Sequence, residues 1–237
     1  AQYTLENENG LAMTFYTYGG IIQSLLVKDR QGIARDVELG FDTLDEYVKA
    51  ACYYGAPIGR YANRIGKSQI DCAGRSIKLL PNEGENQLHG GPDGFFRRRW
   101  EIAEVSDSHV VLHLESPDGD QGFPGNLSVS VCFRVQGSST IRIEYEARVD
   151  APSPVNLTNH AYFNLDGAAT DIRAHRLQIN GRSFAPVAPD LIPLGELAPV
   201  AGTGFDFTRA KLIGQDFLAD EQQQQEAHRP RKAAKIR

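Results

Sequence analysis

The feature that most constrains the fold is an alternation of apolar and polar residues with a period of two. In the segment STIRIEYEARVD (residues 139–150), Ile141 and Ile143 fall on one face, and Arg142 and Glu144 fall on the other. Successive side chains of a β-strand point to opposite faces of a sheet, so this pattern is typical of a strand with one buried face. The segment therefore predicts a half-buried strand.

The same alternation continues along most of the chain, between clusters of turn residues. NLSVSVCFRV (residues 126–135) places Leu127, Val129 and Val131 on one side, and SPDGDQGFPGN, VQGSS and VDAPSPV separate such runs. Only DTLDEYVKAA (residues 42–51) favours a helix, because its acidic residues come early and its lysine comes late. We therefore predict an all-β fold, an antiparallel β-sandwich of many strands without an internal repeat.

Composition excludes several classes of function. The chain has 237 residues, a length that one large all-β domain can fill, and its net charge of −5 gives no reason to expect nucleic acid or an acidic membrane as a partner. No apolar stretch approaches the roughly 20 residues of a membrane helix. No signal peptide is visible at the start, AQYTLENENG, so we expect a cytoplasmic protein. The oligomeric state is not determined by the sequence.

The cysteines indicate neither a disulfide framework nor a metal site. Cys52, Cys72 and Cys132 are odd in number and far apart, and no two His, Cys, Asp or Glu residues show ligand spacing. We therefore expect no metal and no cofactor. Cys132 lies in the apolar run VSVCFRV, so we expect it to be a buried structural thiol.

The last nineteen residues differ in composition from the rest of the chain. ADEQQQQEAHRPRKAAKIR (residues 219–237) has three acidic and five basic residues and one large apolar residue, Ile236. Such a segment has no apolar face to bury. We expect one domain over residues 1–218 and a disordered polar and basic tail over residues 219–237.

Two histidines have neighbours that are unusual for a structural role. His89 lies among glycines in NQLHGGPDGF, and His160 lies in VNLTNHAYFNLDG, where Asn156, Asn159 and Asn164 interrupt an apolar strand. Such polar groups must either bond internally or face a polar ligand. The pattern alone leaves both interpretations open for each histidine. Three further histidines lie in ordinary strand settings: His109, His113 and His175.

A third segment, GRYANRI, brings Arg60, Asn63 and Arg64 close together in the sequence. The guanidinium group of Arg64 and the neighbouring amide of Asn63 suit hydroxyls or carboxylates. The alternative interpretation is that Arg64 pairs across the sheet with an acidic residue.

Five motifs in order closely resemble the bacterial galactose mutarotases, also called aldose 1-epimerases. They are GRYANRI, NQLHGGPDGF with RRW after it, DGDQGFPGNL, TNHAYFNLDG and GTGFDF, and the resemblance extends to about Asp220. It implies a β-sandwich of the supersandwich type. It also implies an enzyme that interconverts the α and β anomers of galactose or glucose without a cofactor, so that its partner is a small aldohexose.

The resemblance assigns roles to individual residues. Opening and reclosing the sugar ring requires an acid for the ring oxygen and a base for the C1 hydroxyl. The family's acid corresponds to His160, and His89 is expected to bind the sugar near its ring oxygen. Contacts to the sugar are implied for five more residues: Asn63, Arg64, Tyr162, Phe163 and Asn164.

The resemblance also implies a later glutamate as the base and a GYDH-type aspartate, and neither motif follows GTGFDF here. Glu221 and Glu226 match no family motif. We therefore predict an interrupted chain without its C-terminal strands and with impaired activity. The alternatives are a non-catalytic sugar-binding remnant and an assembly partner completed by another polypeptide. An epimerase for sugar phosphates would need more cationic residues than Arg60 and the RRRW segment supply.

Overall fold

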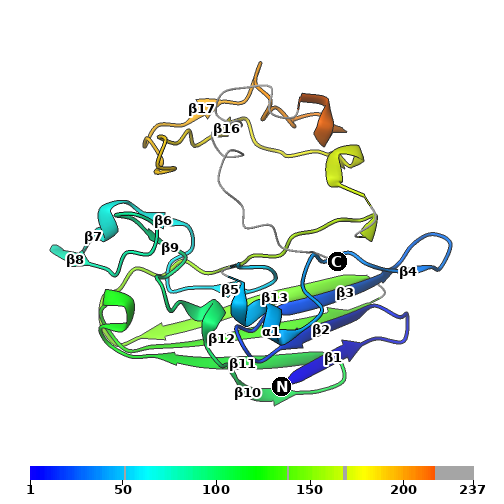
Figure 1. The fold of residues 1–237 in the computed structure, drawn as a ribbon, viewed down its shortest axis with the longest axis horizontal. Coiled ribbons are helices and arrows are strands. Elements are labelled where there is room, and N and C mark those ends of the chain that lie inside the picture. Colours follow the sequence, from blue (N-terminus) through cyan, green and yellow to red (C-terminus); the bar gives the residue numbers. More distant parts are fainter. Residues whose placement is uncertain (51, 138, 168–169, 217–237) are drawn as a thin grey trace. The chain divides into compact units, whose positions relative to one another are not determined.

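The computed structural model describes residues 1–50, 52–137, 139–167 and 170–216 (Figure 1). These residues divide into two compact units, the first up to residue 167 and the second from residue 170. Antiparallel strands dominate the described part, so the predicted all-β fold is confirmed. The prediction of a single domain over residues 1–218 stays a prediction. The predicted tail at residues 219–237 lies outside the described residues.

The first unit begins with a four-stranded antiparallel sheet. Its strands pair in sequence order: β1 (Gln2–Glu6), β2 (Ala12–Tyr16), β3 (Ile22–Lys28) and β4 (Ala34–Asp36). The short helix α1 (Leu44–Lys49) follows, inside the segment predicted to be helical. Its N-cap is Thr43, where the side chain of Glu46 accepts a hydrogen bond of 3.0 Å from the Thr43 backbone N–H.

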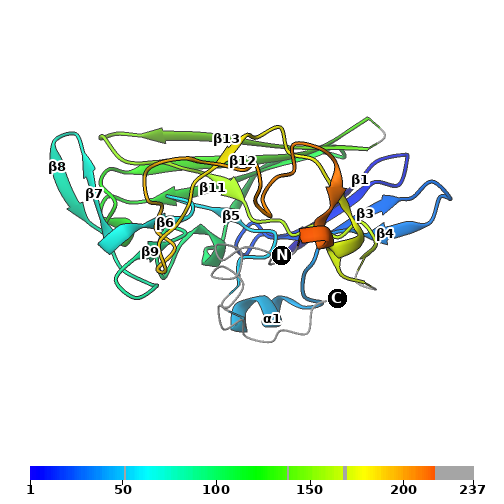
Figure 2. The same cartoon turned by 90° about the horizontal axis from the view of Figure 1, so that it is seen from above.

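A second four-stranded antiparallel sheet contains the strongest sequence alternation. Its strands also pair in sequence order: β10 (Glu101–Val105), β11 (His109–Ser116), β12 (Leu127–Gln136) and β13 (Thr140–Val149). Figure 2 shows β11, β12 and β13 running side by side. On β13, Ile141 and Ile143 are partly buried and Arg142 and Glu144 are exposed, so the predicted half-buried strand is confirmed.

The two sheets share one hydrophobic core, which makes this unit a sandwich. Met13 and Phe15 of β2 pack with Val131 and Phe133 of β12, and the rings of Phe15 and Phe133 lie 6.1 Å apart between centroids. All four side chains are fully buried. Burying one such side chain stabilises the fold by about 1.5–3 kcal/mol.

The prediction of a buried Cys132 is wrong. On β12 the alternation buries Val131 and Phe133 and turns Cys132 to the opposite face, beside Glu144 of β13, where the thiol is only partly buried. An apolar neighbour on each side of the cysteine indicated burial, but the period of two places adjacent residues on opposite faces. All three cysteines have free thiols.

Short strands connect the sheets and carry the residues singled out above. They form three antiparallel pairs: β5 (Pro57–Ile58) with β14 (Thr158–Asn159), β6 (Arg64–Ile65) with β9 (Gln87–Leu88), and β7 (Gln69–Cys72) with β8 (Arg75–Lys78). Two 3₁₀ turns lie at Phe95–Arg97 and Asp120–Gly122.

The second unit has only short strands among its described residues. β15 (Arg176–Leu177) pairs with β18 (Lys211–Leu212), and β16 (Ser183–Phe184) pairs with β17 (Ala198–Pro199). The rings of Phe184 and Phe205 pack together with centroids 4.7 Å apart. In neither unit is any described helix long and apolar enough to cross a membrane.

Candidate functional site

His160 is held in place by its backbone. Its N–H donates a 2.9 Å hydrogen bond to the carbonyl of Ala56, and its carbonyl accepts a 3.1 Å bond from Gly55. These two bonds continue the pairing of β14 with β5 beyond Asn159. Main-chain pairing therefore fixes the backbone from which the imidazole projects.

The asparagines around His160 bond within the protein. Asn156 donates from Nδ2 to the Ala62 carbonyl at 3.2 Å, and Asn159 donates from Nδ2 to the Gly55 carbonyl at 3.0 Å. Asn164 is buried, and its Oδ1 accepts from the Asp166 N–H at 3.1 Å. The polar residues of this strand thus stabilise the backbone, and the imidazole of His160 is left facing the pocket described below.

His89 forms a reciprocal pair with Asn63. The backbone N–H of His89 donates to the Asn63 carbonyl at 3.1 Å, and the backbone N–H of Asn63 donates to Nδ1 of His89 at 3.0 Å. Because Nδ1 accepts a hydrogen bond, the neutral ring carries its proton on Nε2. Gly90 follows with φ of 83°, and a Cβ there would meet the Gly59 carbonyl oxygen at 1.9 Å, so this turn requires glycine.

The two imidazoles meet in an aromatic cluster. The ring centroids of His89 and His160 lie 5.0 Å apart at an interplanar angle of 85°. Tyr53 packs against both, at 4.5 Å from His89 and 5.6 Å from His160, and Tyr162 stacks on His160 at 5.1 Å. Sequence reasoning missed Tyr53, although the adjacent tyrosines Tyr53 and Tyr54 directly precede the GAPIGRYANR segment.

An open pocket of about 510 Å³ lies at this cluster. Of the residues predicted to form the site, four line it: Asn63, His89, His160 and Tyr162. The remaining lining residues are Ala62, Asn156, Leu157, Thr158, Asn159 and Ala161. Segments that are far apart in the sequence are thus brought together, as the motifs implied.

The other three predicted residues lie outside the pocket lining. Arg64 is bonded to Glu83 of the first unit through Nε at 2.5 Å and through a second nitrogen at 3.3 Å. It also donates to Oδ1 of Asn63 at 3.2 Å, which orients that amide. Phe163 is 56% exposed and Asn164 is 3% exposed. Pairing of Arg64 with an acid, one of the two interpretations of the sequence, is therefore present, while sugar contacts by these three residues stay predictions.

Burial makes both histidines poor bases. The pKa of His89 is lowered to about 4, chiefly by desolvation, with further lowering by His160 and Arg64 against an opposing effect of Glu83. The pKa of His160 is also lowered, mainly by burial. Both rings are therefore neutral near pH 7 in the unliganded site. His109 and His113 instead form hydrogen bonds to Glu104 and Glu115 on the second sheet.

A buried acid, Glu38, supports the segment after β14 that carries Tyr162. Glu38 is 3% exposed, and its Oε1 accepts a 3.1 Å hydrogen bond from the Tyr162 N–H. Its other oxygen, Oε2, has no hydrogen-bond partner among the described residues. Desolvation, with a smaller contribution from Asp36, raises the pKa of Glu38 to about 8. Sequence reasoning missed this residue, for which the available signal was one acid inside the apolar run VELGF.

No group of three or more His, Cys, Asp or Glu side chains among the described residues is arranged to hold a metal ion. The pocket itself offers two neutral imidazoles, the oriented amide of Asn63 and the aromatic face of Tyr162. These groups suit a small ligand with several hydroxyls, since imidazoles and amides exchange hydrogen bonds with hydroxyls while aromatic rings pack against an apolar face.

The chain is similar to known proteins over most of its length. The chain is 46% identical to the aldose 1-epimerase of Escherichia coli over 220 residues, which cover 93% of this chain and 64% of that protein. It is 43% identical to the galactose mutarotase of Homo sapiens, covering 87% of this chain and 61% of that protein. The chain thus spans slightly less than two thirds of the length of these relatives.

A solved structure confirms the fold. The aldose epimerase homologue from C. elegans superposes with a TM-score of 0.87 at 34% identity, over 93% of this chain and 68% of that one. The sequence model of the aldose 1-epimerase family matches residues 1–236. The chain therefore belongs to the aldose 1-epimerase family.

Proposed function

We propose that this chain carries the site of an aldose 1-epimerase that interconverts the α and β anomers of galactose or glucose. The observation that carries the proposal is the pair of neutral imidazoles, His89 and His160, with ring centroids 5.0 Å apart beside an open pocket. Membership of the family supports the reaction class. The names of the relatives, aldose 1-epimerase and galactose mutarotase, support an aldohexose as the substrate.

In this proposal His160 is the acid that protonates the ring oxygen of the sugar. Its backbone is held by hydrogen bonds to Gly55 and Ala56, and Tyr162 packs against one side of its ring. Because the pKa of His160 is lowered, the ring is mostly neutral near pH 7, and the proton transfer is made by the minor protonated form, which is a stronger acid toward a weakly basic ether oxygen. The same group can recover the proton when the ring recloses.

His89 acts as a hydrogen-bond donor and not as a base. Its Nδ1 is occupied by the Asn63 N–H, so the Nε2–H is the polar atom that remains for a sugar oxygen. Asn63 complements it, because its Oδ1 accepts from Arg64 and its Nδ2 can donate to a sugar hydroxyl. Tyr162 supplies an aromatic face, and direct sugar contacts by Arg64, Phe163 and Asn164 remain part of the proposal.

A second candidate function is sugar binding without turnover. None of the described residues that line the pocket carries a carboxylate to accept the proton of the C1 hydroxyl. This observation favours a chain that recognises aldohexoses through His89, Asn63 and His160 and does not speed their interconversion. The two functions share the same binding residues and differ only in the reaction rate.

The experiment that separates them combines polarimetry with thermal unfolding. Freshly dissolved α-galactose is followed by optical rotation with and without the chain, and the Tm of the chain is measured over a range of galactose concentrations. Acceleration together with a rise in Tm is the result expected of an epimerase. A rise in Tm without acceleration supports the binding function. If galactose changes neither the rate nor the Tm, both candidate functions are contradicted. The cytoplasmic location stays a prediction from the sequence.

A further inference from the structure

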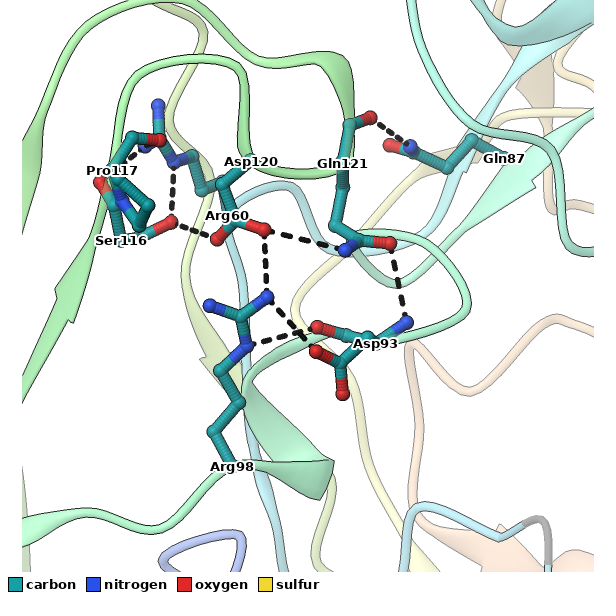
Figure 3. Close-up of polar contacts among 8 residues, drawn as sticks. All are labelled: Arg60, Gln87, Asp93, Arg98, Ser116, Pro117, Asp120 and Gln121. Carbon is teal, nitrogen blue, oxygen red and sulfur yellow. Dashed lines mark hydrogen bonds and ion pairs between the residues drawn. The ribbon is translucent and has the colours of Figure 1, made fainter.

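The loop of residues 116–124, here called the 116–124 loop, contains most of the DGDQGFPGNL motif, to which neither proposed function assigns a role. Figure 3 shows its contacts with two other segments. One is the segment that holds Arg60 and continues to Asn63, and the other runs from Gln87 to Arg98 and includes His89. The loop therefore bonds to the two segments that contain Asn63 and His89, the two residues of the reciprocal pair.

Arg60 attaches the first of these segments to the loop. Its side chain is fully buried, and its guanidinium group donates to the Ser116 hydroxyl at 2.9 Å and to three backbone carbonyls. These carbonyls belong to Ser116, Pro117 and Pro124, at 2.5, 2.9 and 2.9 Å. Arg60 thus fixes the loop to the backbone three residues before Asn63.

Gln121 attaches the second segment on both sides of His89. Its carbonyl accepts a 3.2 Å bond from Nε2 of Gln87, two residues before His89, and its side-chain Oε1 accepts a 3.2 Å bond from the Asp93 N–H, four residues after His89. Between them, the backbone of Gly91 lies so close that a Cβ there would meet Oε1 of Gln121 at 2.8 Å. One residue of the loop therefore contacts the chain before and after the imidazole.

Neighbouring charges hold the Gln121 side chain in this position. Asp120 Oδ1 accepts from Nε2 of Gln121 at 3.2 Å and from Arg98 at 2.6 Å, and Arg98 also bonds to Asp93 at 3.1 Å (Figure 3). The other oxygen of Asp120 accepts from the Ser116 hydroxyl, which in turn accepts from Arg60. Gln121 has φ of 52°, a left-handed conformation uncommon for residues other than glycine, asparagine and aspartate.

We infer that Gln121 is a positioning residue for the proposed reaction, one that sets the location of the His89 imidazole by holding Gln87, Gly91 and Asp93. This role in catalysis rests on the proposed epimerase function. Positioning of His89 itself does not, because it concerns the geometry of the unliganded protein. A misplaced donor costs rate, since a displacement of about 1 Å can lower catalysis up to 100-fold.

The test is the variant Gln121→Gly in the 237-residue chain. Glycine accepts a φ of 52° without strain, so this change removes the side-chain contacts to Asp93 and Gly91 and keeps both the turn and the backbone bond to Gln87. The matched control is Ala73→Gly in the exposed β7–β8 turn, where Ala73 has φ of 49°. Both variants gain the same backbone freedom in the unfolded chain, and only the first alters the surroundings of His89.

The primary readout is the ¹⁵N spectrum of the His89 ring. In the unaltered chain and in Ala73→Gly we expect the Nε2–H tautomer with an accepting Nδ1. In Gln121→Gly we expect a mixture of tautomers and a His89 that titrates closer to the ordinary histidine range. Where the chain accelerates mutarotation, kcat falls about 10-fold or more in Gln121→Gly and is unchanged in Ala73→Gly.

An unchanged His89 spectrum in folded Gln121→Gly overturns the inference. If Gln121→Gly does not fold, the test uses Gln121→Asn. Asparagine tolerates the left-handed conformation, and its side chain is one methylene shorter. An unchanged ¹⁵N spectrum of the His89 ring in this variant would likewise overturn the inference. Absence of mutarotation by the unaltered chain counts against the proposed function alone. The ring spectrum still tests the positioning of His89 in that case.

Discussion

The Asn63 N–H donates a 3.0 Å hydrogen bond to Nδ1 of His89, while the His89 N–H donates a 3.1 Å bond to the carbonyl of Asn63. Each residue thereby fixes the other: the backbone pairing sets the distance, and the bond to Nδ1 selects the tautomer. The Nε2–H that results is a hydrogen-bond donor for a ligand at every pH above the lowered pKa of His89.

Acid should destabilise the fold through His89. The pKa of His89 is about 4 in the folded chain and near its ordinary 6.5 in the unfolded chain, so the unfolded state binds a proton first as the pH falls. This contribution to stability is complete above about pH 6.5 and is lost as the pH falls to about 4. We expect a loss of about 2–3 kcal/mol, measured by urea unfolding at several pH values. The decrease should be smaller in His89→Gln, and equal decreases would contradict the assignment.

Glu38 should have the opposite dependence on pH. Its pKa is raised to about 8, so the folded state keeps a proton that the unfolded state loses above about pH 4.5. Stability contributed by the neutral form therefore decreases between pH 4.5 and 8. Glu38→Gln, which cannot ionise, should match the unaltered chain near pH 5 and exceed it by several kcal/mol near pH 9. The exposed Glu85→Gln is the control, and identical pH profiles for Glu38→Gln and the unaltered chain would refute this account.

Arg60→Lys should destabilise the first unit strongly. A lysine has three donors in place of five and cannot reach the Ser116, Pro117 and Pro124 carbonyls together. Buried acceptors without partners cost about 1–3 kcal/mol each, so we expect a loss of about 3–5 kcal/mol in urea unfolding. The exposed Arg142→Lys on β13 should change stability by less than about 0.5 kcal/mol. A similar loss in the free energy of unfolding for the two variants would show that the hydrogen bonds of Arg60 add little to stability.

The two faces of β12 should differ in their response to mutation. Phe133 is fully buried in the shared core, so Phe133→Ala should cost about 3–5 kcal/mol. Cys132 lies on the opposite face and is partly buried, so Cys132→Ser should cost less than about 1 kcal/mol. Urea unfolding of both variants measures the contrast. A cost for Cys132→Ser equal to that of Phe133→Ala would contradict the assignment of faces.

Local patterns predicted the fold well where one face of a strand is buried. The period-two alternation at residues 126–135 and 139–150 corresponds to β12 and β13, because burial of one face imposes that period. The same rule corrects the prediction for Cys132. The pairing of β14 with β5 was beyond such reasoning, since it joins segments about one hundred residues apart and each strand has only two residues.

The site was predicted in part for the same physical reason. His89, His160 and Asn63 stand out as polar residues among glycines or apolar neighbours, and all three line the pocket. Tyr53, Glu38 and Gln121 do not stand out, because their roles depend on contacts with residues far away in the sequence. The left-handed φ at Gln121, and an oxygen on Glu38 that has no hydrogen-bond partner among the described residues, are visible only in three dimensions.

The most direct test of the central claim is the rate of mutarotation of freshly dissolved α-galactose with the unaltered chain, His160→Ala and His113→Ala. His113 lies on β11 with Nε2 bonded to Glu115, so its removal controls for the loss of an imidazole. Loss of a positioned acid lowers the rate by about 10²–10⁴-fold, so His160→Ala should approach the buffer rate while His113→Ala equals the unaltered chain. Acceleration that survives in His160→Ala would contradict the assignment of His160 as the acid.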